Sequence, residues 1–164
     1  MQRKTILTAC AGLVFCSGAL AAEIIVPTQM PLSLALATAA SGDTITLLAS
    51  GSPYQTFPGY SFAGKALLIR GSTGNPVDVV IDGYGLDIAL RIDGAGAAGT
   101  VLQDLTIRNG KGATTANANG AGLVLTNGAS TTLRHCVVRD NVNPSADGNG
   151  AGIYVSSASL RLSV

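Results

Sequence analysis

The chain has 164 residues, of which 47% are apolar and 12% charged, and its formal net charge is +1. This length suits a single domain, and so small a charge excludes the basic surface that binds nucleic acids or anionic membranes. Aromatic residues make up 4% and tryptophan is absent, so medium-sized aliphatic side chains in thin stacked layers are favoured over one bulky core.

Residues 1–21 have the pattern of a secretory signal peptide. Arg3 and Lys4 give a positive start, an apolar run follows from Ile6 to Leu20, and Ala19-Leu20-Ala21 is a small-x-small cleavage site. The apolar run is shorter than the about 20 residues that a membrane-spanning helix needs, so we prefer cleavage to a retained membrane anchor. Cleavage leaves eight basic and nine acidic residues, a net charge of −1.

The cysteines predict no intrachain disulfide after export. Leu7-Thr8-Ala9-Cys10 resembles a bacterial lipobox, so lipidation at Cys10 is an alternative, although few apolar residues precede it. Otherwise Cys10 and Cys16 leave with the signal peptide and Cys136 remains alone. A lone thiol is either buried and inert or exposed and reactive, and the strand-like flanks in LRHCVV favour burial.

The mature chain, residues 22–164, is expected to begin with a capping helix. Pro31 suits the first turn of a helix, PLSLALATAA contains good helix formers, and Ser41-Gly42 provides a stop. We expect DTITLL, which begins at Asp43, to be the first strand. A short amphipathic helix before it would cover the open core of a stack of coils.

The rest of the chain repeats itself. Residues 101–110 align with residues 132–141 at an offset of 31, which places Leu102 over Leu133 and Ile107 over Val138. NGAGLVL and NGAGIYV align at an offset of 30, and LRHCV and LRLSV at an offset of 27. An upstream version of the unit begins at Ala89. Such periods are typical of solenoids, propellers and arrays.

Of these architectures, a parallel β-helix of about four coils fits best, with an all-β fold class. The units are rich in glycine and β-branched residues and lack helical periodicity, and two or three short strands per unit are too few for a propeller blade. The segments KGATTANA and NPSADG are expected to bulge outward as loops. Asn109 and Asn141 follow corresponding strands, and they either form an amide ladder or serve as turn residues.

Nearly all of the mature chain resembles the right-handed parallel β-helices of the pectin-lyase-like superfamily. The resemblance rests on LSLALATAASGDTITLLASGSPYQTF, with Gly42-Asp43-Thr44-Ile45 and Tyr54, and on VVIDGYG. The GAGL and GAGI units resemble the repeats of polymorphic outer-membrane proteins, although Val138 stands where those repeats usually have Phe. The resemblance implies a fold that serves lyases, hydrolases, adhesins and structural shafts alike.

No catalytic, binding or metal-ligating residue can be assigned from the sequence. Turn formation is the default interpretation of the aspartates, which are Asp78, Asp82, Asp87, Asp93, Asp104, Asp140 and Asp147. Asp104 and His135 occupy aligned positions and are expected to form a polar pair. Arg108 and Arg139 should stack, either as a solvated edge or as a grip for a uronate or sulfate. His135 lacks partners at zinc-ligand spacing, and the phosphate-loop and calcium β-roll patterns are absent.

The sequence therefore predicts an exported β-helix segment, secreted or on the bacterial cell envelope, that acts as a structural, adhesive or glycan-contacting module. Its expected partners are polysaccharides or cell-surface glycans, not nucleic acids, and membrane attachment would need a further C-terminal anchor. The alternative is the N-terminal fragment of a polysaccharide lyase or glycoside hydrolase, for which calcium would be the cofactor. Because SLRLSV stops in mid-repeat, we expect a truncated product, and a prematurely terminated reading frame is a third interpretation.

Overall fold

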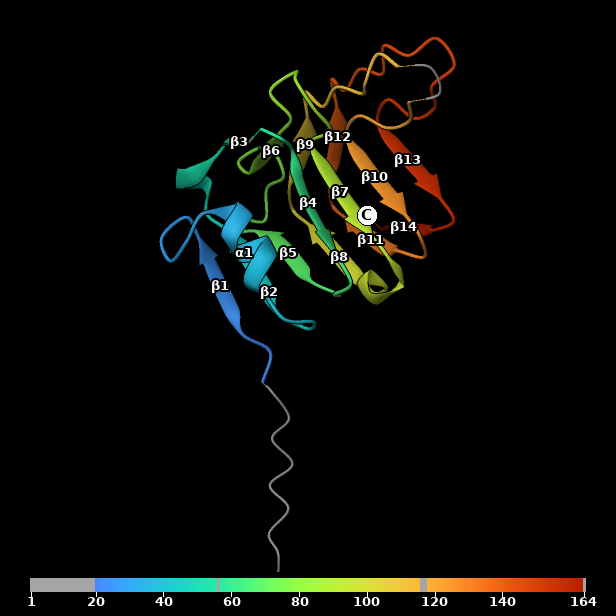
Figure 1. Ribbon diagram of the computed structural model, residues 1–164. Coiled ribbons are helices and arrows are strands. Elements are labelled where there is room, and N and C mark those ends of the chain that lie inside the picture. Colours follow the sequence, from blue (N-terminus) through green and yellow to red (C-terminus); the bar gives the residue numbers. More distant parts are fainter. Residues whose placement is uncertain (1–19, 56, 116–117, 164) are drawn as a thin grey trace, which may run out of the picture.

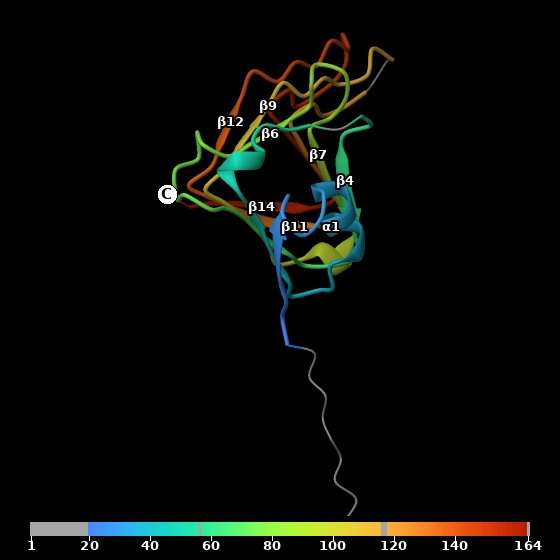
Figure 2. The ribbon, with the colours of Figure 1, turned by 90° about the vertical axis from the view of Figure 1, so that its left-hand side faces the viewer.

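The computed structural model describes residues 20–55, 57–115 and 118–163, and these form a parallel β-helix of about four turns. The chain passes in turn through three parallel sheets, here called sheets A, B and C, so that successive coils stack along one axis (Figure 1). Figure 2 looks along this stack and shows the three walls around the core. The expected signal peptide lies almost wholly outside the described residues.

Within the described residues, each sheet takes one strand from each coil. Sheet A contains, in spatial order, β1 (Glu23–Val26), β2 (Thr44–Leu47), β5 (Leu68–Gly71), β8 (Thr100–Gln103), β11 (Ser130–Arg134) and β14 (Ser159–Ser163). Sheet B contains β3 (Tyr54–Gln55), β6 (Val80–Asp82), β9 (Thr106–Arg108) and β12 (Val137–Arg139). Sheet C contains β4 (Tyr60–Ala63), β7 (Leu90–Asp93), β10 (Leu123–Thr126) and β13 (Ile153–Ser156). Short 3₁₀ turns occur at Ala49–Gly51 and Ala95–Ala97.

The core is a set of aliphatic columns that run along the stack. In sheet A, Ile45, Ile69, Leu102 and Leu133 are partners in consecutive strands, and each is at most 5% exposed. The predicted pairing of Leu102 with Leu133 is confirmed, as is the offset of 30 that pairs NGAGLVL with NGAGIYV. A strand in this position is buried on one face by its own coil and hydrogen-bonded at both edges by its neighbours.

The expected offset of 27 for the last repeat is wrong. Leu133 pairs with Leu162, an offset of 29, and Leu160 pairs with Thr131. Strands β10 and β13 of sheet C are paired at an offset of 30 residues. The turn between β13 and β14 has one residue fewer than the turn between β10 and β11, so β11 and β14 of sheet A are paired at an offset of 29. Because Leu160 and Leu162 are two residues apart in β14, they lie on the same face of sheet A, opposite Thr131 and Leu133. Their sequence similarity did not distinguish the two registers.

The N-terminal strand was missed in the sequence. We expected the first strand at Asp43, but β1 precedes the helix and pairs with β2, from Glu23 opposite Thr44 to Val26 opposite Leu47. The buried carboxylate of Asp43 joins these elements, because it accepts hydrogen bonds from the backbone N–H of Ala22 at 2.8 Å and of Ala40 at 2.7 Å. A four-residue strand bounded by alanines and a proline gives little periodic signal.

The capping helix is confirmed. Helix α1 (Leu32–Thr38) begins directly after Pro31 and buries Leu32, Ala35 and Leu36 against the first coil. It ends three residues before the expected stop at Ser41-Gly42, because Ala39 already has an extended backbone. The ammonium group of Lys65 donates hydrogen bonds to the carbonyls of Ala37 and Ala39, both at 2.9 Å, and so satisfies groups that a helix C-terminus leaves open.

Corner residues of successive coils adopt the same left-handed conformation. Asp104 and His135 have φ of 53° and 47°, and Asn109 and Asp140 have φ of 51° and 55°. These positions follow strands that pair in register, and Asp and Asn tolerate positive φ better than most residues. The turn interpretation is thus confirmed for Asp104, Asp140 and Asn109.

Asn109 and Asn141 do not form an amide ladder. The carboxamide nitrogen of Asn109 donates to Asp82 at 2.9 Å, whereas the oxygen of Asn141 accepts from the N–H of Gly110 at 2.8 Å. Because Arg108 pairs with Arg139, the residue that corresponds to Asn109 in the next coil is Asp140, and Asn141 lies one residue further along. Stacked asparagines occur instead in the loops, where Oδ1 of Asn119 accepts from the N–H of Asn149 at 2.7 Å.

We expect Leu102→Ala to lower the free energy of unfolding by about 2 to 5 kcal/mol, because it opens a cavity between coils. The matched control is Leu34→Ala, on the outer side of α1 and 48% exposed, which should change it by less than about 0.5 kcal/mol. Urea denaturation followed by circular dichroism measures both. Equal losses in the two variants would contradict the stacked core.

Candidate functional site

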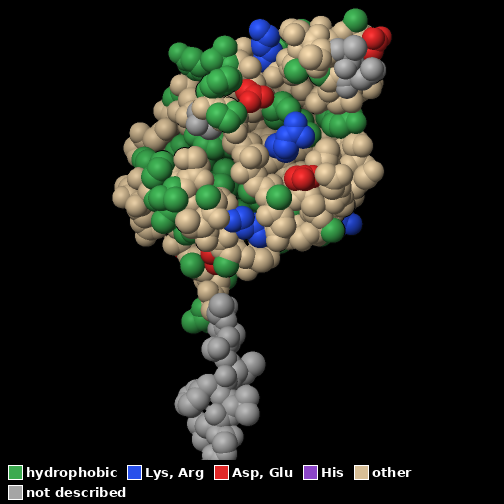
Figure 3. Space-filling view, viewed as in Figure 1, with side chains coloured by type: hydrophobic (Ala, Val, Ile, Leu, Met, Phe, Trp, Pro, Cys, Tyr) green, Lys and Arg blue, Asp and Glu red, His purple; other side chains and the backbone are tan. Residues whose placement is uncertain are grey.

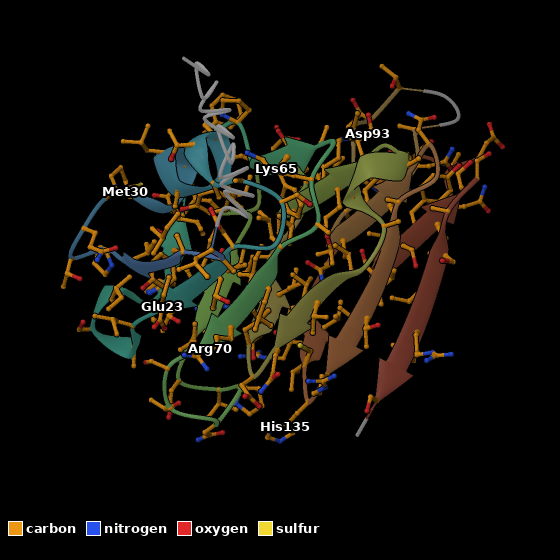
Figure 4. The ribbon with its side chains drawn as sticks, turned by 90° about the horizontal axis from the view of Figure 1, so that it is seen from below. Glu23, Met30, Lys65, Arg70, Asp93 and His135 are labelled. Carbon is orange, nitrogen blue, oxygen red and sulfur yellow. The ribbon has the colours of Figure 1, made fainter. Side chains whose placement is uncertain are left out.

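Polar side chains form a continuous stripe on the outer face of sheet A. The register places Thr46, Arg70, Gln103 and Arg134 opposite one another in β2, β5, β8 and β11. Consecutive strands of a sheet are about 4.8 Å apart, so the stripe repeats polar groups at that interval along the stack. We call these four residues the polar stripe. Figure 4 views this face and labels Glu23, Arg70 and His135 along it.

Hydrogen bonds hold the first half of the stripe in place. The guanidinium of Arg70 donates through Nε to Thr46 Oγ1 at 3.0 Å and through Nη2 to Glu23 Oε1 at 2.8 Å. Hydrogen bonds from Thr46 and then from Arg70 hold the pKa of Glu23 below its usual value. Both charged groups of this pair are about half exposed, so the pair orients Arg70 more than it stabilises the fold.

The second half of the stripe is linked to a polar pair at the neighbouring corner. Arg134 donates to Gln103 Oε1 at 3.2 Å, and Gln103 donates to Asp104 Oδ2 at 2.9 Å. Nδ1 of His135 lies 2.8 Å from Asp104 Oδ1, which confirms the predicted pair. The hydrogen bond from Gln103, followed by that of His135, lowers the pKa of Asp104.

A shallow polar hollow of about 320 Å³ lies beside the stripe. Its floor is formed by Thr46, Arg70, Gln103 and Asp104, and its rim by the loop Gly71–Gly74. Guanidinium, amide and hydroxyl groups together offer donors and acceptors at several points. The hollow is therefore a polar surface and not an apolar pocket.

The remaining aspartates are dispersed, and most of them accept hydrogen bonds or pair with an arginine within the fold. Asp82 is buried against Arg108, Asp87 accepts from the N–H groups of Gly59 and Ile88, and Asp93 accepts from Thr126 and Asn127. Asp78 accepts from Asn75, Asp140 pairs with Arg139, and Asp147 is exposed in a loop. Within the described residues, no three His, Cys, Asp or Glu side chains converge as metal ligands.

Arg108 and Arg139 are partners in β9 and β12, as expected. Each is nevertheless committed to an acid: Arg108 Nε lies 2.9 Å from Asp82 Oδ2, and Arg139 contacts Asp140. Each guanidinium group is therefore neutralised by its own carboxylate. The two arginines form separate ion pairs at the edge of sheet B and do not form an anion-binding site.

Cys136 is half-buried at the last coil, so the expected burial is only partly realised. It lies in an apolar hollow of about 390 Å³ with Leu133, Val138, Ile153 and Leu162. Its sulfur is 3.3 Å from the carbonyl oxygen of Leu102, and burial raises the pKa of the thiol. A protonated thiol in such a place is a packing residue more than a nucleophile.

No protein-family model, no curated protein and no solved structure matches the chain. In the part of the chain that the structure describes, no helix has both the length and the apolarity to cross a membrane.

Asp93→Asn should lower stability at neutral pH, because hydrogen bonds from Thr126 and Asn127 to the carboxylate lower the pKa of Asp93. A depressed pKa contributes stability that is fully present above the unfolded value of about 3.9, and that contribution is lost as the pH falls from there through the lower pKa of the folded state. We expect the urea midpoints of wild type and variant to differ at pH 7 and to converge near pH 2. Asp147→Asn is the control, and a gap that persists at pH 2 would contradict the assignment.

Proposed function

We propose that this protein is an exported β-helix module that contacts polysaccharide chains through the polar stripe and its adjoining hollow. The observation that carries the proposal is the repetition of hydrogen-bonding side chains, one per coil, on the outer face of sheet A. A polysaccharide is itself a repeat of hydroxyl-bearing rings, so a linear array of fixed polar groups engages several rings together. Multiple weak contacts of this kind add up through avidity.

The resemblance of the sequence to the pectin-lyase-like superfamily and to polymorphic outer-membrane repeats supports this proposal over an intracellular role. The superfamily fold also serves lyases and hydrolases. A non-catalytic role is favoured because the acids near the stripe have other partners: Glu23 pairs with Arg70, and Asp104 with Gln103 and His135. A hydrolase needs two carboxyl groups at a defined separation across the bond that breaks.

Binding to polygalacturonate, measured by biolayer interferometry at low salt, tests the stripe. We expect the double variant Gln103→Ala with Arg134→Ala to bind about tenfold more weakly, because it removes a cation and an amide from consecutive coils. The matched control is Arg139→Ala on sheet B, another exposed arginine, which should bind like wild type. Equal losses in both would contradict the stripe. Calcium-dependent release of unsaturated product, read by absorbance, would instead favour the lyase alternative.

If the protein is exported, signal-peptide cleavage fixes which residue is N-terminal, and this can be tested separately. Cleavage after Ala21 would convert the N–H of Ala22, which lies 2.8 Å from Asp43 Oδ1, into an α-ammonium group. We expect mass spectrometry of the exported protein to identify Ala22 as its N-terminal residue. Asp43→Asn should then lower its melting temperature, and the difference should shrink as the pH rises past about 8, where α-amino groups lose their proton. A mature protein that retains residues 1–21 would contradict export by this route.

A further inference from the structure

Two exposed aromatic side chains lie on neighbouring loops that the polar stripe does not use. Phe57 follows β3 and Tyr84 follows β6, and these residues are 69% and 62% exposed. Gln55 pairs with Asp82, so both aromatic residues stand two positions beyond paired strand ends on consecutive coils. Leu86, on the same loop as Tyr84, is 56% exposed. We call Phe57, Tyr84 and Leu86 the loop ridge. Figure 3 shows apolar side chains gathered at the upper left, where Figure 1 places β3 and β6.

Tyr84 has a backbone conformation that its side chain disfavours. Its φ is 59°, in the left-handed region that a bulky residue rarely occupies. The other described non-glycine residues with positive φ are Asp, Asn, Ser or His. Strain of this kind persists only where the surroundings enforce it, and it is concentrated at binding and catalytic sites. Because the residue is largely exposed, packing of the fold does not explain the choice of tyrosine.

A buried carboxylate enforces the strained conformation. Asp82 is 3% exposed, and its Oδ1 accepts a hydrogen bond from the N–H of Tyr84 at 2.8 Å. Its Oδ2 accepts from Arg108 Nε and Asn109 Nδ2, both at 2.9 Å. The N–H of Gly85 donates to the carbonyl of Asn109 at 2.7 Å. The next coil thus fixes the backbone on which the exposed ring stands.

A hollow of about 240 Å³ adjoins the loop ridge. Pro58 and Asp87, the residues that follow Phe57 and Leu86, line it together with Ser61 and Arg91. One carboxylate and one guanidinium give this hollow no net charge. It therefore presents hydroxyl, carboxylate and guanidinium groups on the turns and strands that follow the loop ridge, without a net charge that would favour an anion.

We propose that the loop ridge and this hollow bind a neutral sugar ring within a polysaccharide, a site independent of the polar stripe. The aromatic side chains stack on the apolar C–H face of the ring, and Ser61 and Arg91 bind its hydroxyl groups. Asp87, whose carboxylate accepts from the N–H groups of Gly59 and Ile88, balances the charge of Arg91. The three side chains of the ridge cover far less than the about 800 Å² per partner of a stable protein interface, which disfavours a protein as the occupant. The balanced charge favours a neutral hexose over a uronate.

Fluorine NMR of the protein labelled with 3-fluorotyrosine tests the proposal directly. The chain has four tyrosines, and Tyr84→Phe identifies the resonance of Tyr84. The probes are cellohexaose, laminarihexaose, mannohexaose and maltohexaose, with hexagalacturonate as the anionic counterpart. We expect at least one neutral probe to shift the Tyr84 resonance, while the resonance of the buried Tyr54, which lies outside the hollow, stays unchanged. The proposal is overturned if no neutral probe shifts it, or if hexagalacturonate shifts it more.

Substitutions separate binding from folding. Tyr84→Ala and Phe57→Ala should each weaken binding of that neutral probe by about tenfold, because each removes a stacking surface. Val155→Ala, also an exposed apolar residue but on β13, should leave binding unchanged. Tyr84→Gly should lose binding yet raise the melting temperature by a few degrees, because glycine adopts positive φ without strain. A lower melting temperature in Tyr84→Gly would show that the ring serves the fold, and would overturn the proposal.

Discussion

Each coil of this protein can bury its apolar side chains only against the coils on either side. Ile45, Ile69, Leu102 and Leu133 form one such column, and each fully buried aliphatic side chain contributes about 1.5 to 3 kcal/mol. No single coil supplies a core of its own, so the stack forms as a unit. The first coil has a helix over its core, where Leu32, Ala35 and Leu36 replace the missing neighbour.

The same stacking fixes what the outer surface presents. Side chains alternate across a strand, so once Leu102 points inward, Gln103 must point outward, and parallel register places Arg70 and Arg134 on either side of it. The polar stripe is therefore a by-product of the core columns. Loops are freer, because a change in their length does not disturb the strand register, and the loop ridge stands on two of them.

The two proposed sugar-contacting surfaces differ in how they are held. The polar stripe stands on strands that are hydrogen-bonded on both sides, and its side chains form hydrogen bonds with one another. The loop ridge depends on a few buried groups, of which the carboxylate of Asp82 is central, since it joins β6 to Arg108 and Asn109 of the next coil. Strain at Tyr84 is tolerated because those contacts over-determine the loop.

The sequence by itself determined the fold class, the capping helix and the pairing of Leu102 with Leu133, because a repeat of 30 or 31 residues with inward aliphatic positions has few other solutions. It also placed Asp104 beside His135, since both lie at the same point of that repeat. Only the tertiary structure decided the register of Leu162, the strand β1 and the polar stripe. Coil length varies along the chain, from 24 residues between Thr44 and Leu68 to 33 between Leu68 and Val101. Positions such as Arg70 and Gln103 therefore share no constant spacing, and only the hydrogen-bonded register brings them together.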